Sequence, residues 1–119
     1  MGDDFVKPVL TPAAIEGSLL TTVNGYTVIQ VNSADYFKIR GYRSIMILAD
    51  AATNDLHFKV ETSHDAVKWR TKKEDWEITA GETDGESMME PWNYMKISVK
   101  PQVGGAHGTG SFQIEGSSL

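Results

Sequence analysis

The imidazole side chains are the first candidates for chemistry in this sequence, because histidine can serve as a base, an acid or a metal ligand near neutral pH. There are three of them: His57, His64 and His107. Each role needs a second group held against the ring, and none of the three stands at a metal-ligand spacing from another histidine or from a carboxylate on the same strand face. We predict surface positions for all three.

Carboxylates form three groups that could coordinate a hard cation: Asp3 with Asp4, Asp50 with Asp55, and Glu82 with Asp84 and Glu86. Calcium requires several converging oxygen ligands, and the sequence contains neither an EF-hand nor a repeat-type calcium loop. We therefore predict solvated acidic loops, the longest of them over residues 80–91. A calcium site at the edge of a sandwich is the alternative.

The sequence also contains no motif for nucleophilic catalysis or for phosphate binding. Ser18 and Ser111 follow glycines but open strands, whereas a hydrolase nucleophile sits on a strained G-x-S-x-G turn. The chain has no cysteine, which excludes thiolate nucleophiles, thiolate metal sites and disulfides. The glycine-rich residues 104–110 precede no helix that could hold a phosphate. We predict that the protein is not an enzyme and needs no cofactor.

Composition narrows the class of partner. The 119 residues are 40% hydrophobic and 23% charged, with a net charge of −5, which is typical of one globular domain. A nucleic-acid partner would need a concentrated basic surface. No stretch approaches the roughly 18 apolar residues of a membrane span, and the acidic N-terminus lacks the features of a secretory signal. We predict synthesis in the cytoplasm and binding to neither nucleic acid nor membrane.

The elements that would position any site are strands. From Gly17 onward, short runs of β-branched and aromatic residues alternate with Asn, Asp, Gly and Ser. Asn24-Gly25 predicts a type I′ hairpin between residues 18–23 and 26–31, and the apolar residues 42–49 predict a strand in the middle of a sheet. A two-residue apolar period recurs at Leu56/Phe58/Val60, Val67/Trp69, Trp76/Ile78, Met95/Ile97/Val99 and Phe112/Ile114. The pattern predicts an all-β fold, a single antiparallel two-sheet β-sandwich of jelly-roll type over residues 17–119.

Residues 1–16 differ in composition from the rest of the chain. Pro8 and Pro12 disfavour both a helix and a place inside a sheet, so we predict an extended N-terminal arm. Exposing the apolar side chains of this arm to water would be unfavourable, so we expect them to bind the arm to its own domain or to a neighbouring subunit. These partner-binding residues are Phe5, Val6, Val9, Leu10 and Ile15.

The three tryptophans could form a stacking surface for sugars, whose C–H faces pack on flat rings. Trp69 and Trp76 each alternate with charged neighbours, which predicts that both indoles point into the core. Trp92 is different, because it follows a proline at the start of a strand. It remains a ligand-facing candidate, together with Tyr94 and Tyr36.

The segment from Val60 to Trp69 reads VETSHDAVKW, and it is followed by ITAG at residues 78–81 and PWNYMKISV at residues 91–99. This succession resembles small β-sandwich domains of tailed-phage structural proteins, in which a strand ends in a Ser-x-Asp-Gly turn ahead of a tryptophan. The resemblance extends over residues 42–115, with Ala66 where the turn glycine would stand. Similar domains also occur in carbohydrate-binding and discoidin-like modules.

The resemblance and the apolar arm together imply a non-enzymatic virion structural protein of a tailed phage or phage-like particle, such as a capsid decoration, neck or tail component. Such a protein would move to the virion after synthesis in the host cytoplasm. We expect self-association in a closed ring such as a trimer, and contacts with other virion proteins such as a major capsid protein. The alternative function is that of a carbohydrate-binding β-sandwich module that uses Trp92, Tyr94 or Tyr36.

Overall fold

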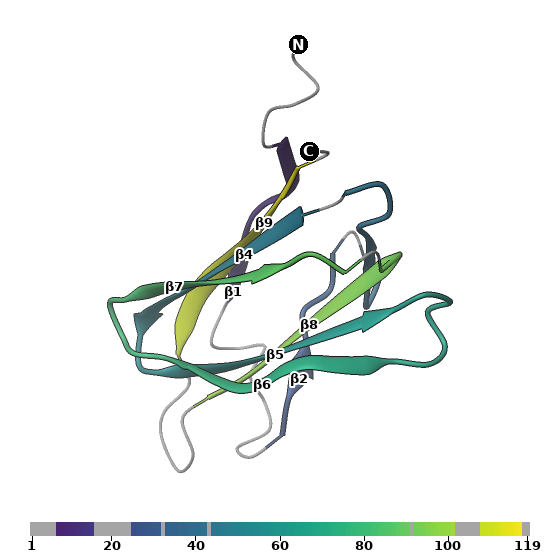
Figure 1. Cartoon of the computed structure of the whole chain (residues 1–119). Coiled ribbons are helices and arrows are strands. Elements are labelled where there is room, and N and C mark those ends of the chain that lie inside the picture. The colour runs from purple at the N-terminus through teal and green to yellow at the C-terminus, as the bar shows by residue number, and fades with distance from the viewer. Residues whose placement is uncertain are drawn as a thin grey trace.

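The computed structural model describes residues 7–15, 25–31, 33–42, 44–90, 92–101 and 108–117. Every regular element in these ranges is a β-strand, and the strands form two facing sheets (Figure 1). They are β1 (Lys7–Ile15), β2 (Thr27–Val28), β3 (Phe37–Lys38), β4 (Ser44–Thr53), β5 (Leu56–Ser63), β6 (Arg70–Ile78), β7 (Thr83–Met88), β8 (Tyr94–Pro101) and β9 (Thr109–Ser117). Over the described ranges no helix is long and apolar enough to cross a membrane.

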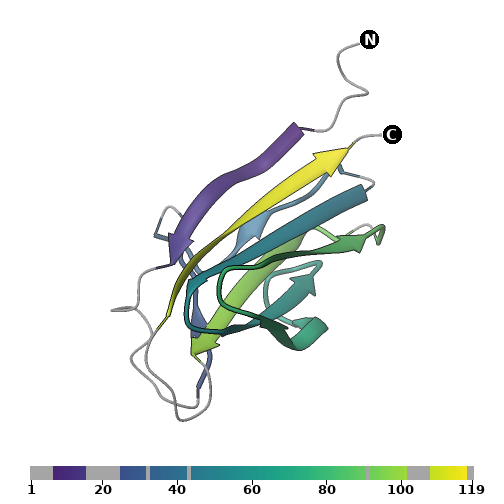
Figure 2. The same cartoon turned by 90° about the vertical axis from the view of Figure 1, so that its left-hand side faces the viewer.

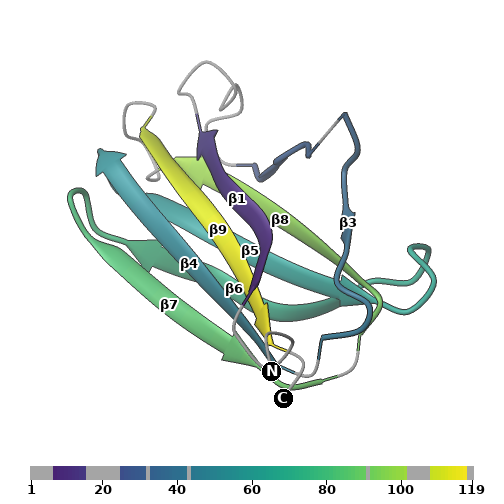
Figure 3. The same cartoon turned by 90° about the horizontal axis from the view of Figure 1, so that it is seen from above.

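The strand order is that of a jelly roll. Sheet A runs β1-β9-β4-β7, and sheet B runs β2-β8-β5-β6 with β3 also paired to β8. The antiparallel pairs are nested, β1 with β9, β2 and β3 with β8, β4 with β7, and β5 with β6, as in one long hairpin folded over on itself. Figure 3 shows sheet A lying across sheet B. The predicted antiparallel two-sheet β-sandwich is confirmed.

Part of the predicted arm is a strand of sheet A. Residues 7–15 pair with β9 at the sheet edge, where β1 runs beside it in Figure 2. Pro8 and Pro12 are compatible with this position because an edge strand, unlike a strand inside a sheet, tolerates residues without an N–H donor. The register shifts on both sides of Leu10. In this single chain the segment therefore pairs with its own domain.

Other predictions about the N-terminal region reach beyond the described residues. Phe5 and Val6 lie outside them, and Val9 and Ile15 are placed by their backbone within β1. Residues 16–24 lie outside them too, so the boundary of the arm at residue 16 and the hairpin at Asn24-Gly25 stay predictions.

The acidic stretch at residues 80–91 is not simply a loop, because residues 83–88 form β7 at the other edge of sheet A. Asp84, Gly85 and Glu86 have low strand propensity, which is why the sequence does not reveal this strand. Two contacts to β6 hold it across the sandwich. The Trp76 indole donates a hydrogen bond to Asp84 over 2.9 Å, and Lys73 pairs with Glu86 at 2.8 Å.

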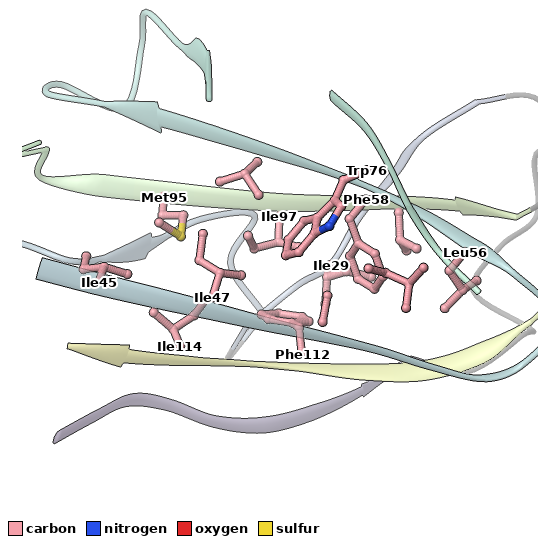
Figure 4. Packing of buried hydrophobic residues seen from close by; sticks show 14 of the residues in the cluster. Ile29, Ile45, Ile47, Leu56, Phe58, Trp76, Met95, Ile97, Phe112 and Ile114 are labelled. Carbon is pink, nitrogen blue, oxygen red and sulfur yellow. The ribbon is translucent and has the colours of Figure 1, made fainter. Parts of the chain in front are cut away.

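The core lies between the sheets and follows the two-residue period of the sequence. The inward side chains of β5, β8 and β9 are buried, and Figure 4 shows Phe58, Ile97 and Phe112 meeting between the layers. β4 lies between β9 and β7, so the predicted central strand is confirmed. Only its inward face is covered, because Met46 on the other face is 39% exposed.

The predicted alternation fails at one place. Val67 is 77% exposed and Trp69 is half-buried, whereas both are predicted to point inward. Residues 64–69 form the turn between β5 and β6, so strand parity does not apply there. Trp76, inside β6, is buried as predicted.

Candidate functional site

Three aromatic rings cluster on the outer face of sheet B, next to the β5–β6 turn. Tyr36 precedes β3, Trp69 precedes β6, and Tyr94 begins β8. The centroid of the Tyr36 ring lies 5.7 Å from that of Trp69 and 5.5 Å from that of Tyr94. The Lys96 ammonium lies 4.3 Å from the centroid of the Trp69 ring, which gives a cation–π contact. Aromatic residues from three separate parts of the chain therefore form one surface cluster.

A second ring pair lies at the same end of sheet B. The imidazole of His64 packs on the indole of Trp92 with 4.4 Å between ring centroids and 30° between planes. Backbone contacts hold the two segments together: Asn93 donates its N–H to the carbonyl of Ser63 and its side-chain amide to the carbonyl of His64. His64 is exposed, as predicted. Its stacking on Trp92 is not visible in the sequence.

Side chains of the β5–β6 turn build its geometry. The buried Ser63 hydroxyl accepts the N–H of Ala66 and donates to the carbonyl of Lys68 over 2.6 Å. The Asp65 carboxylate accepts the N–H groups of Lys68 and Val67, each over 2.9 Å. These two backbone donors, that of Lys68 first, lower the pKa of Asp65 below its ordinary value. The turn that presents His64 and Trp69 is therefore ordered by local hydrogen bonds.

Ala66 has a φ of 61°, in the left-handed region that favours glycine. Replacing Ala66 with glycine is expected to raise the free energy of unfolding by about 1 kcal/mol, because an L-residue pays about that much for this conformation. Chemical denaturation would measure the gain. The control is Ala80→Gly, at an exposed position without positive φ, which should lower stability by adding backbone freedom. A neutral or destabilising Ala66→Gly would show that the turn is not strained.

Two depressions share Trp92 in their lining. One, of about 330 Å³, is lined by His64, Asp65, Lys68, Trp69, Arg70 and Trp92. The other, of about 350 Å³, is lined by Thr62, Arg70, Thr71, Lys72, Glu90 and Trp92. Arg70 and Trp92 belong to both, so the two depressions adjoin. Their volumes lie at the small end of the range for small-molecule sites.

Two lysines near this surface are neutralised, whereas Lys68, which lines one depression, has no ion pair with a described residue. Lys72 pairs with Glu90 at 3.2 Å, and Lys96 lies 4.0 Å from Glu61. The Arg70 side chain, which is exposed, has no ion pair or hydrogen bond with any residue that the structure describes. An exposed guanidinium that lines two adjoining depressions can receive an anion.

A separate polar network occupies the middle of the same face. The Tyr26 hydroxyl donates to Asp75 over 3.0 Å, and Lys100 pairs with that carboxylate at 2.9 Å. Burial raises the pKa of Tyr26 to about 12. The same network lowers the pKa of Asp75, chiefly through the hydrogen bond from Lys100. Because its charges pair with each other, this network provides no free group for a ligand.

The predicted site residues meet in part. Tyr36 and Tyr94 contact each other, and Trp92 lines the neighbouring depressions. Trp69, which is predicted to lie in the core, joins them at the surface, and Arg70 is not predicted at all. Among the residues that the structure describes, no group of three or more His, Asp or Glu side chains could hold a metal ion.

Comparisons with known proteins give two structural likenesses. The chain is similar to a protein of the disulfide-linked pili that form Bacillus endospore appendages, with a TM-score of 0.45, 9% identity, and coverage of 98% of this chain and 94% of that one. It is also similar to a protein of the infectious bursal disease virus Gx strain, with a TM-score of 0.44, 14% identity, and coverage of 95% of this chain and 30% of that one. No protein-family model matches the sequence, and no curated protein matches it.

Proposed function

We propose that this chain is a non-enzymatic structural protein that acts through protein–protein contacts, as a capsid decoration, neck or tail component of a tailed-phage or phage-like particle. The observation that supports it most is the nested jelly-roll strand order, an architecture used by viral capsid domains and by lectins. A fold alone does not assign a role. The resemblance of the sequence to tailed-phage domains favours the virion among the roles that this fold serves.

The geometry of the β5–β6 turn adds to this support. Ser63 and Asp65 hydrogen-bond to the backbone of the turn, and the position where tailed-phage domains carry glycine has a positive φ. The turn geometry therefore accounts for the Ser-x-Asp-Gly motif, because a positive φ at its fourth position favours glycine.

The proposal is tested with the full-length protein and particles assembled without it. Light scattering is expected to give a discrete closed oligomer such as a trimer, and the protein should co-sediment with the particles. Neutral salt should weaken this binding only modestly if buried surface drives it. A monomer that does not bind the particles would overturn the proposal.

The same sample can show whether β1 is exchanged between subunits. Ala14 and Ser111 are direct partners in the β1–β9 ladder, and the chain contains no cysteine that would compete. Antiparallel partners lie at a Cα separation suited to a disulfide. In the double variant Ala14→Cys with Ser111→Cys we expect an intrachain bond and a monomer band on a non-reducing gel. Disulfide-linked oligomers that are absent from the Ala14→Cys control would instead show exchange.

A second candidate function is carbohydrate binding, and the clustering of Tyr36, Trp69 and Tyr94 beside Trp92 favours it. Flat rings half-open to solvent are what sugar C–H faces pack against. A jelly roll is also a lectin architecture, so the two candidate functions share one fold.

A further inference from the structure

The strongest unassigned feature of the molecule is the pair of adjoining depressions around Trp92, together with the unpaired Arg70. We propose that they form one extended binding site for an acidic saccharide, a glycan that carries carboxylates, and that Arg70 selects the charge. This inference rests on the second candidate function and deepens it by naming the class of ligand.

The rings provide the saccharide part of the site. Trp92 lines both depressions, and His64 packs against its ring. Trp69 lines only the depression of about 330 Å³, the one that also contains His64. Two adjoining compartments that share one indole suit a chain of linked sugar units better than a single compact ligand.

The charges favour an acid over a neutral sugar. Three basic and two acidic side chains line the two depressions, although the whole chain carries a net charge of −5. Both acids are engaged: Asp65 accepts the N–H groups of its own turn, and Glu90 pairs with Lys72. Arg70 and Lys68 are the lining bases with no acidic partner among the described residues, and of these two only Arg70 lines both compartments. Its planar fork can bind a carboxylate through two parallel hydrogen bonds, which a lysine cannot do.

The position of Arg70 also limits how the ligand lies. As the first residue of β6 it pairs with Thr62 of β5, next to the turn that holds His64. A carboxylate bound there would lie where the two compartments adjoin, so neighbouring sugar units could contact Trp92 and Trp69.

The test uses the full-length protein and two probes with one sugar skeleton, an oligogalacturonate and its methyl ester, measured by isothermal titration calorimetry. We expect the acid to bind and the ester to bind at least about tenfold more weakly, the effect of one lost charge-assisted contact. Arg70→Ala should remove this difference, and Arg70→Lys should restore only part of it. Trp92→Phe, which keeps a ring, should weaken both probes.

The matched control is Arg40→Ala, because Arg40 is exposed and lines neither depression. It should leave both affinities unchanged, and urea denaturation should show that every variant is folded. Equal binding of acid and ester, unaffected by Arg70→Ala, would overturn this inference while carbohydrate binding stands. If the protein binds neither probe and no glycan on an array, both this inference and the carbohydrate-binding function are overturned. The proposed structural role is then decided by the assembly test alone.

Discussion

Replacing Trp76 with alanine is expected to lower the free energy of unfolding by about 3–5 kcal/mol, a large share of the total stability of a domain this size. The side chain is 4% exposed and packs on Phe58 with 6.0 Å between ring centroids. Its indole also donates a hydrogen bond to Asp84, which joins the edge strand β7 to sheet B. Truncation therefore removes core packing and one of the contacts that close the sandwich. Urea denaturation would measure the loss.

The matched control for this substitution is Trp69→Ala. Trp69 is half-buried, and the contacts that the structure gives its ring are with Tyr36 and Lys96 at the surface. We expect it to cost no more than about 1 kcal/mol, since it opens no cavity in the core. Trp76→Phe keeps most of the packing and isolates the hydrogen bond to Asp84. Equal losses for the two alanine variants would contradict the placement of Trp76 in the core.

Replacing Gly110 with alanine is expected to cost about 3 kcal/mol, at the upper end for overpacking. Gly110 lies in β9 opposite Ala51 of β4 and Ile15 of β1. A β-carbon there would collide with the backbone carbonyl of Asp50 and lie 2.8 Å from the Leu56 side chain. A backbone atom in a paired strand cannot move aside cheaply, so β4 or β9 must shift. The thermal midpoint should fall by about 10 °C for this loss.

Gly85→Ala is the control, because it adds the same methyl group to a strand of the same sheet. Its closest contacts would be the ends of flexible side chains, Met46 Sδ at 3.2 Å and Leu48 Cδ2 at 3.3 Å, and the nearest backbone atom given lies at an ordinary contact distance of 3.8 Å. We expect a change within about 0.5 kcal/mol, since the side chains can yield and alanine favours folding over glycine. A Gly110 variant as stable as the Gly85 variant would show that the β4–β9 ladder is not as closely paired as described.

The proposed saccharide site and the proposed assembly role use different parts of the molecule. The depressions lie at the β5–β6 turn of sheet B, whereas β1 forms the edge of sheet A. A particle protein could therefore bind a glycan while sheet A faces its partners. Arg70→Ala separates the two roles, because it should change glycan affinity without changing the oligomeric state.

Much of the fold follows from local pattern. The two-residue period of Leu56, Phe58 and Val60 predicts which face of β5 is buried, because side chains of a strand alternate between the two faces wherever the strand lies. The apolar run at residues 42–49 likewise predicts a central strand. Local pattern does not predict β7, because its residues Asp84 and Glu86 are held in place by Trp76 and Lys73 of β6.

The candidate site shows the same division. Trp92, Tyr94 and Tyr36 are proposed from the sequence as ligand-facing candidates, and the structure brings the Tyr36 and Tyr94 rings together and places Trp92 in the lining of the depressions. Trp69 and Arg70 are not proposed from the sequence, since the parity of a strand says nothing about a residue in a turn. The pairing of His64 with Trp92 joins positions 28 residues apart.

By itself, then, the sequence determined an all-β sandwich and the inward-facing residues within its strands, which depend on neighbours within a few positions. The tertiary structure alone decided the nested strand order, the pairing of β1 with β9, and the assembly of rings around Arg70. The physical reason is that strand partners are chosen by the burial of whole faces and the closure of long loops, and these energies belong to no single segment of the chain.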